Sequence, residues 1–68
     1  MSRVAGTVAE FDEQRGTGTV EDGEGRQLFF HCTAIADGSR TIAAGARVTY
    51  VVVPGGLGRW EAADLRPT

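Results

Sequence analysis

The sequence predicts an all-β domain in which five short strands close into a small barrel. The 68-residue chain contains ten glycines and two prolines, and its β-branched and aromatic runs are separated by turn-forming clusters. No segment shows the period of an amphipathic helix. An open sheet of this size would leave long unpaired edges and only half a core, so we expect the sheet to close. Residues 1–68 are expected to form a single domain.

The first two strands are expected at residues 4–11 and 16–21. β-Branched residues in a mixed alternation fill the first strand, which ends at the polar cluster Asp12-Glu13-Gln14. The alternation slips near Glu10 and Phe11, which predicts a bulge or a strong bend there.

A hairpin turn at residues 22–25 leads to the third strand, residues 26–32. Two glycines in this turn readily adopt positive φ. Residues 33–36 are too few for an ordinary helix and predict one tight turn.

The fourth strand, residues 46–53, is the clearest because it is rich in valine. It is expected to end at Pro54-Gly55-Gly56, a turn sequence that cannot continue a ladder. Residues 60–65 form the fifth strand, and residues 66–68 are expected to fray.

Charge and composition limit the functions available to the chain. The net charge is −2, from nine carboxylates and seven arginines without lysine, which argues against strong non-specific attraction to phosphate backbones. A single cysteine cannot form an internal disulfide, and the chain has neither a charged-then-apolar leader nor a long apolar run. We therefore expect a cytoplasmic protein without a membrane partner.

Two segments carry the functional signal, Arg15-Gly16-Thr17-Gly18-Thr19-Val20 and Leu28-Phe29-Phe30-His31-Cys32. They resemble the paired nucleic-acid motifs of the bacterial cold-shock domain, whose first motif usually reads basic-Gly-aromatic-Gly-aromatic-aliphatic. Further segments match the family in order: Gly6-Thr7-Val8, Thr33-Ala34-Ile35, Ala44-Gly45, Arg47-Val48 and Ala62-Ala63. The resemblance implies a five-stranded antiparallel OB-fold barrel. It also implies binding of single-stranded RNA or DNA, with a role as an RNA chaperone or as a regulator of transcription or translation in a stress response.

Five ring positions of the family are lost in this chain. They are occupied by Glu10, Thr17, Thr19, Cys32 and Ser39. Stacking of one base on an aromatic ring contributes about 1–3 kcal/mol, so we expect binding to be weak and poorly selective for sequence.

The period of a strand places Thr17 and Thr19 on one face of the second strand and directs Phe29 and His31 outward from the third. The two threonines either bond bases or phosphates through their hydroxyls or are simply good strand formers in water. Phe29 and His31 either remain as a stacking pair, or a loop or the side chain of Trp60 covers Phe29.

The resemblance also implies contacts around this pair. Arg15 and Arg40 fall on basic positions and are candidates for phosphate contacts, and Phe11 flanks the face. Trp60, preceded by Arg59, is either a relocated stacking platform with an adjacent cation or a plug in the end of the barrel.

No constellation for catalysis or for a cofactor is present. His31 and Cys32 are adjacent on a predicted strand and should project to opposite faces, with Cys32 buried as a small apolar residue. One histidine and one cysteine also fall short of the four donors of a structural zinc site. We expect neither an enzyme nor a metal or cofactor site. The alternative function is a barrel whose face contacts a protein partner or a second copy of the chain.

Overall fold

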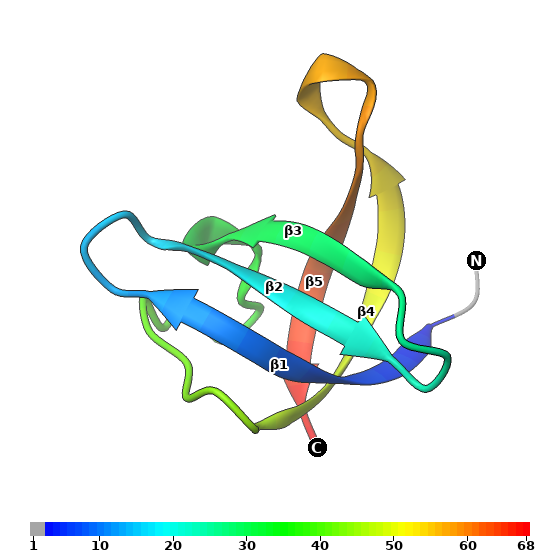
Figure 1. Ribbon diagram of the computed structural model, residues 1–68. Coiled ribbons are helices and arrows are strands. Elements are labelled where there is room, and N and C mark those ends of the chain that lie inside the picture. Colours follow the sequence, from blue (N-terminus) through cyan, green and yellow to red (C-terminus); the bar gives the residue numbers. More distant parts are fainter. Residues whose placement is uncertain (1–2) are drawn as a thin grey trace.

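Five strands form a closed barrel in the computed structural model, which describes residues 3–68 (Figure 1). The predicted barrel is therefore confirmed. Around the barrel the strands follow the order β1-β2-β3-β5-β4, and β4 pairs with β1 to complete the ring. The elements in chain order are β1 (Val4–Asp12), β2 (Thr17–Asp22), β3 (Gln27–His31), the 3₁₀ turn η1 (Cys32–Ala34), β4 (Arg47–Pro54), the 3₁₀ turn η2 (Gly56–Gly58) and β5 (Trp60–Pro67).

The sheet is mixed, which corrects the expectation of a purely antiparallel barrel. β3 and β5 run parallel and are paired at Phe29 and Glu61, whereas the other neighbouring strands are antiparallel. A closed barrel of five strands requires at least one parallel pair. If every neighbouring pair were antiparallel, strand directions would alternate around the barrel, which is possible only for an even number of strands. The long segment between η1 and β4 carries the chain across the barrel (Figure 1).

The core lies inside the ring and is built from inward-facing residues of all five strands together with Ile35. Its buried members are Val8, Val20, Phe30, Ile35, Val48, Tyr50, Ala62 and Leu65. Period two produces this arrangement, since Val48 and Tyr50 are buried while the alternate residues of β4 are more exposed.

β1 contains the irregularity that its sequence predicts. Its pairing with β2 shifts between Val8 and Glu10, so the bulge falls at Ala9, slightly before the predicted position. After the bulge, Glu10 pairs with Thr19 and Phe11 with Gly18. β1 thus remains paired with β2 in a register shifted by one residue. Glu10 and Phe11 both border the outer face of the sheet.

The C-terminal residues do not fray. β5 continues to Pro67, with Arg66 paired to Thr49 and Pro67 to Val48, and the Thr68 amide donates to the Arg47 carbonyl at 3.0 Å. Pro54 is also part of the ladder, as the last residue of β4 opposite Trp60. The position of Pro54 at the end of the strand explains why its missing N–H is tolerated.

The loop that joins β4 to β5 projects beyond the rest of the barrel (Figure 1). Leu57 in this loop has φ 60°, in the left-handed region, and is 95% exposed. Between residues 3 and 68, the structure contains no helix of sufficient length and hydrophobicity to cross a membrane.

Candidate nucleic-acid interface

One outer face of the barrel collects the side chains of both sequence motifs. The register of β2 and β3 sets Thr17 opposite His31 and Thr19 opposite Phe29. The residues between them, Gly18 and Phe30, are paired and buried on the inner face. The two threonines, the phenyl ring and the imidazole therefore share one face, as the strand period predicts; we call these four residues the β2–β3 face.

A shallow hollow of about 310 Å³ runs along this face. It extends from the end of β1, over the turn that follows, to β2 and β3, and its lining includes Glu10, Phe11, Arg15, Thr17, Thr19 and Phe29. Asp12 also lines it and builds the turn, because its Oδ1 accepts from the amides of Gln14 at 3.0 Å and Arg15 at 3.2 Å. The lining therefore combines polar side chains with two aromatic rings, those of Phe11 and Phe29.

Gly18 is required beneath this hollow. A Cβ at this position would lie 2.9 Å from Cζ of Phe30 and 3.0 Å from Cδ1 of Phe11. The two rings stack almost in parallel, with centroids 5.9 Å apart and planes at 11°. Phe11 is thus anchored to the core through Phe30 and half-exposed at the hollow, which makes it a rigid edge of the site.

Phe29 is covered on one side by a cation. The Cζ atom of Arg59 lies 5.1 Å from the centroid of the Phe29 ring. Arg59 belongs to the loop before β5, so this loop covers Phe29, one of the two alternatives predicted for its cover, and Trp60 does not. Arg59 is exposed and the contact is worth about 0.5–1 kcal/mol at such a site, so a stacking base, at about 1–3 kcal/mol, can displace it.

Trp60 does not plug the barrel, because the residue is 60% exposed. It lies at the start of β5 beside a second hollow that it shares with Thr19, Phe29 and Arg59. The structure therefore places Trp60 next to the β2–β3 face, where an exposed indole can offer a flat surface.

His31 is exposed, and its orientation is fixed. As the N-cap of η1, it accepts through Nδ1 from the Thr33 amide at 3.3 Å, and its Nδ1 lies 3.1 Å from the Thr33 Oγ1. A ring nitrogen that accepts carries no proton, so in the neutral imidazole the proton is on Nε2. This arrangement leaves the N–H free to donate to a ligand.

The strand pattern predicts that Cys32 and His31 project to opposite faces of the sheet, and this prediction is wrong. β3 ends at His31, and the chain turns into η1, so the two side chains approach with Sγ 3.8 Å from Nδ1. Cys32 is half-buried rather than fully buried, against Gly16. Residues 3–68 contain no group of three or more His, Cys, Asp or Glu that could hold a metal ion.

Charges of both signs border the face. Glu10 is exposed at the hollow, and Nε of Arg15 lies 3.9 Å from Oδ2 of Asp12, a distance at which exposed groups attract only weakly. Arg40 is exposed in the segment between η1 and β4, outside the lining of the hollow. The structure thus brings together the predicted residues apart from Arg40.

Two features of the site have no local sequence signal. One is the contact between Arg59 and Phe29, which depends on β5 lying beside β3. The other is the Oγ1 atom of Thr19, which is buried and makes no hydrogen bond within the described residues. The position of Arg59 immediately before β5 would have indicated its contact with Phe29 only if the pairing of β5 with β3 had been known.

Comparisons with known proteins agree with this geometry. A family model described as 'Cold-shock' DNA-binding domain matches residues 4–68. The chain is 39% identical over 61 residues to Cold shock-like protein CspE of Escherichia coli strain K12, covering 85% of this chain and 87% of that protein. It is 42% identical over 66 residues to Glycine-rich protein 2 of Nicotiana sylvestris, covering 93% of this chain but 30% of that longer protein. With its barrel, its paired motifs and a match that spans nearly its whole length, the chain belongs to the cold-shock domain family of nucleic-acid-binding domains.

Proposed function

We propose that the chain binds single-stranded RNA or DNA through the β2–β3 face. The observation that carries this proposal is the cross-strand register, which sets Phe29 and His31 opposite Thr19 and Thr17 on one outward surface. Phe29 offers a ring for stacking, His31 an oriented N–H, and Arg15 and Arg59 the nearest cations. The family relationship supports a role as an RNA chaperone or as a regulator of transcription or translation, in the cytoplasm and during stress.

Binding is weak in this proposal. Threonines occupy the two ring positions of β2, and each missing stack removes about 1–3 kcal/mol. Glu10 and Asp12 at the hollow offset the charge of Arg15. With few cations near the path of the strand, the salt dependence of binding is shallow.

A titration with an eight-nucleotide oligothymidylate at low salt tests the proposal. We expect chemical-shift changes confined to the β2–β3 face and its borders, together with quenching of Trp60 emission. His31→Ala should weaken binding, whereas Thr7→Ala, on an exposed part of β1 outside the hollow, should not. Binding weaker than millimolar, or shifts on another surface, would refute the proposal.

A second function, self-association or contact with a protein partner, is favoured by Leu57. A leucine in the left-handed region is strained, and this one is 95% exposed between glycines that would adopt the conformation freely. Strained residues cluster at functional sites, and a partner could bury this exposed side chain. Light scattering across a range of protein concentrations tests this, since Leu57→Gly should abolish any dimer while relieving strain. A monomer at every concentration would exclude self-association.

A further inference from the structure

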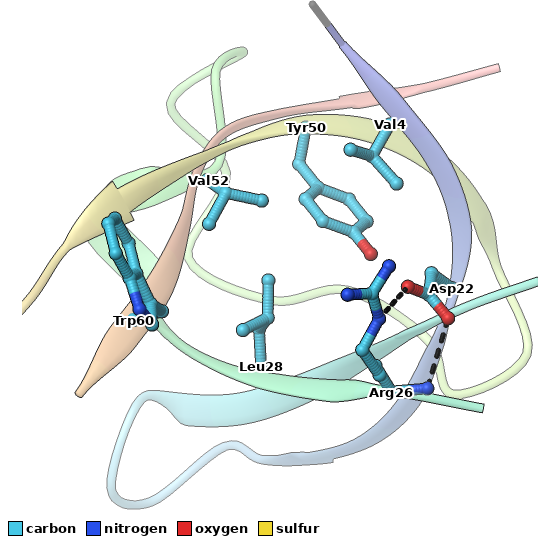
Figure 2. Close-up of a pocket in the computed structure, with 7 residues that line it drawn as sticks. All are labelled: Val4, Asp22, Arg26, Leu28, Tyr50, Val52 and Trp60. Carbon is cyan, nitrogen blue, oxygen red and sulfur yellow. Dashed lines mark hydrogen bonds and ion pairs between the residues drawn. The ribbon is translucent and has the colours of Figure 1, made fainter. Parts of the chain in front are cut away.

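Another hollow, of about 370 Å³, opens at the end of the barrel (Figure 2). Four strands supply apolar side chains to its lining: Val4 of β1, Leu28 of β3, Val52 of β4 and Trp60 of β5. Asp22, Arg26 and Tyr50 complete the lining. Val52 is 38% exposed. This volume lies within the range of small-ligand sites, and the lining is suited to a flat ring.

Tyr50 supplies a polar atom at the inner end of this hollow. The residue is fully buried, and its Oη makes no hydrogen bond within the described part of the chain. Figure 2 shows the hydroxyl directed toward the side of the hollow formed by Arg26 and Asp22. The absence of a side chain at Gly6 leaves room for this ring, because a Cβ on Gly6 would lie 2.9 Å from Cε1 and 3.2 Å from Oη of Tyr50.

The hydroxyl of Tyr50 is available as a donor. Burial raises its pKa, and the nearby Asp22 carboxylate adds to the effect, so the group keeps its proton at neutral pH. A buried hydroxyl without a partner is destabilising, and an acceptor on a ligand would satisfy it. Arg26 covers this end of the hollow, but its side chain is 76% exposed and can move without disturbing the core.

The charges at the hollow favour a neutral ligand over a phosphate. Arg26 is held by two carboxylates, with Nε 3.2 Å from Oδ2 of Asp22 and Nη2 3.0 Å from Oε1 of Glu24. Paired with both carboxylates, Arg26 offers little net positive charge to an anion. A flat, neutral ring that carries a hydrogen-bond acceptor, as a nucleobase does, therefore fits this site better than an anion.

The hollow is also continuous with the path of the strand. Leu28 and Trp60 line both this hollow and the neighbouring one, which contains Phe29 and Arg59. A strand that passes over Phe29 and crosses Trp60 reaches the end of the barrel. We propose that the barrel-end hollow holds one unpaired base of the strand bound on the β2–β3 face, with Trp60 beside it and the Tyr50 hydroxyl donating to it. This inference rests on the proposed single-strand binding.

Tyr50→Phe tests the inference because it removes the hydroxyl and keeps the ring. Its affinity should be compared with that of the unmodified protein for oligothymidylates of four and eight nucleotides, while the methyl signals of Val4, Leu28 and Val52 are followed. We expect the longer strand to shift these methyl signals. Tyr50→Phe should bind the longer strand about two- to tenfold more weakly and the shorter one unchanged.

A second variant guards against an indirect effect of Tyr50→Phe. Val52→Phe fills the hollow from a partly exposed position, so the barrel should still fold. It should reduce the affinity for eight nucleotides toward that for four. If the longer strand binds with shifts on the β2–β3 face but none at these methyls, the inference is wrong and the proposed function stands. If neither strand binds, both fail.

Discussion

The guanidinium of Arg59 lies over the ring of Phe29, with Cζ 5.1 Å from the ring centroid. This contact places a cation at the surface where a base would stack. A base gains more from the ring than the guanidinium loses, so ligand binding releases Arg59. The freed side chain then lies next to the bound strand and can pair with a phosphate.

Arg59→Gln should therefore change the salt dependence of binding. Loss of one phosphate contact makes the slope of log K against log salt shallower by about 0.7 for a single strand. Arg47→Gln removes the same charge from an exposed part of β4 outside the hollow and serves as the control. Fluorescence titrations at several salt concentrations measure both slopes, and equal slopes for the two variants would contradict the prediction.

Thr19→Val should stabilise the barrel. Its buried Oγ1 has no partner among the described residues, so the isosteric methyl removes a desolvation cost and raises the free energy of unfolding by about 1 kcal/mol. For a domain of this size the melting temperature should rise by about 4–8 °C. Calorimetry measures the change. Thr17→Val is the control: the buried hydroxyls without a partner in residues 3–68 include that of Thr19 but not that of Thr17.

Thr17→Phe should restore a stacking platform opposite His31. The added ring should contribute about 1–3 kcal/mol per stacked base, which lowers Kd by about 5- to 150-fold. Titration with the same oligothymidylate provides the measurement. Thr7→Phe introduces an identical ring on β1 outside the hollow; if both variants gain affinity equally, the gain is non-specific and the face is assigned incorrectly.

Gly18→Ala should destabilise the barrel strongly. The methyl group would collide with the backbone carbonyl oxygen of Glu10 and press on the rings of Phe11 and Phe30, and such overpacking costs about 1–3 kcal/mol. A Cβ on Gly23 has no neighbour within 4 Å, so Gly23→Ala is the matched control. Urea denaturation of both variants measures the difference, and a Gly18→Ala variant as stable as the control would contradict the prediction.

The stability of the barrel should decline in acid partly through Asp64. Hydrogen bonds from Arg3, and then from Arg66, hold the pKa of this carboxyl below its ordinary value of 3.8. The charged form is favoured in the folded state, so its contribution is present above that value and is lost as the pH falls through the lowered pKa.

Asp64→Asn should therefore lose less stability than the unmodified protein between about pH 4 and pH 2. Asparagine also tolerates the positive φ of 53° at this position. Glu13→Gln, at an exposed turn carboxylate without an ion pair in residues 3–68, is the control. Urea midpoints across this pH range give the result, and parallel curves for all three proteins would contradict it.

The barrel and the β2–β3 face could be predicted because local patterns determine them. Alternation directs Thr17 and Thr19 to one side, and the short turn before β3 fixes the register that sets them opposite His31 and Phe29. Cys32 was misplaced because β3 ends one residue earlier than its pattern indicates, and one residue in a strand changes the face.

Other features depend on contacts between distant parts of the chain. Arg66 and Pro67 have the composition of a fraying end, yet β4 supplies partners for both. The Arg59 contact requires β5 to lie beside β3. The ring of Tyr50 occupies space that a side chain on Gly6 would fill, and its buried hydroxyl has no partner in residues 3–68. The periodicity of neighbouring residues does not predict contacts between segments that are far apart in the sequence.

The parallel junction of β3 and β5 has the shortest ladder of the barrel, one pairing between Phe29 and Glu61. Local opening of the barrel should therefore begin between β3 and β5, where the fewest backbone hydrogen bonds must break. Phe29 is also the ring on which a base would stack. A nucleic-acid strand bound on Phe29 would hold β3 and β5 together. Binding on the outer face and the stability of the closed barrel are therefore thermodynamically linked.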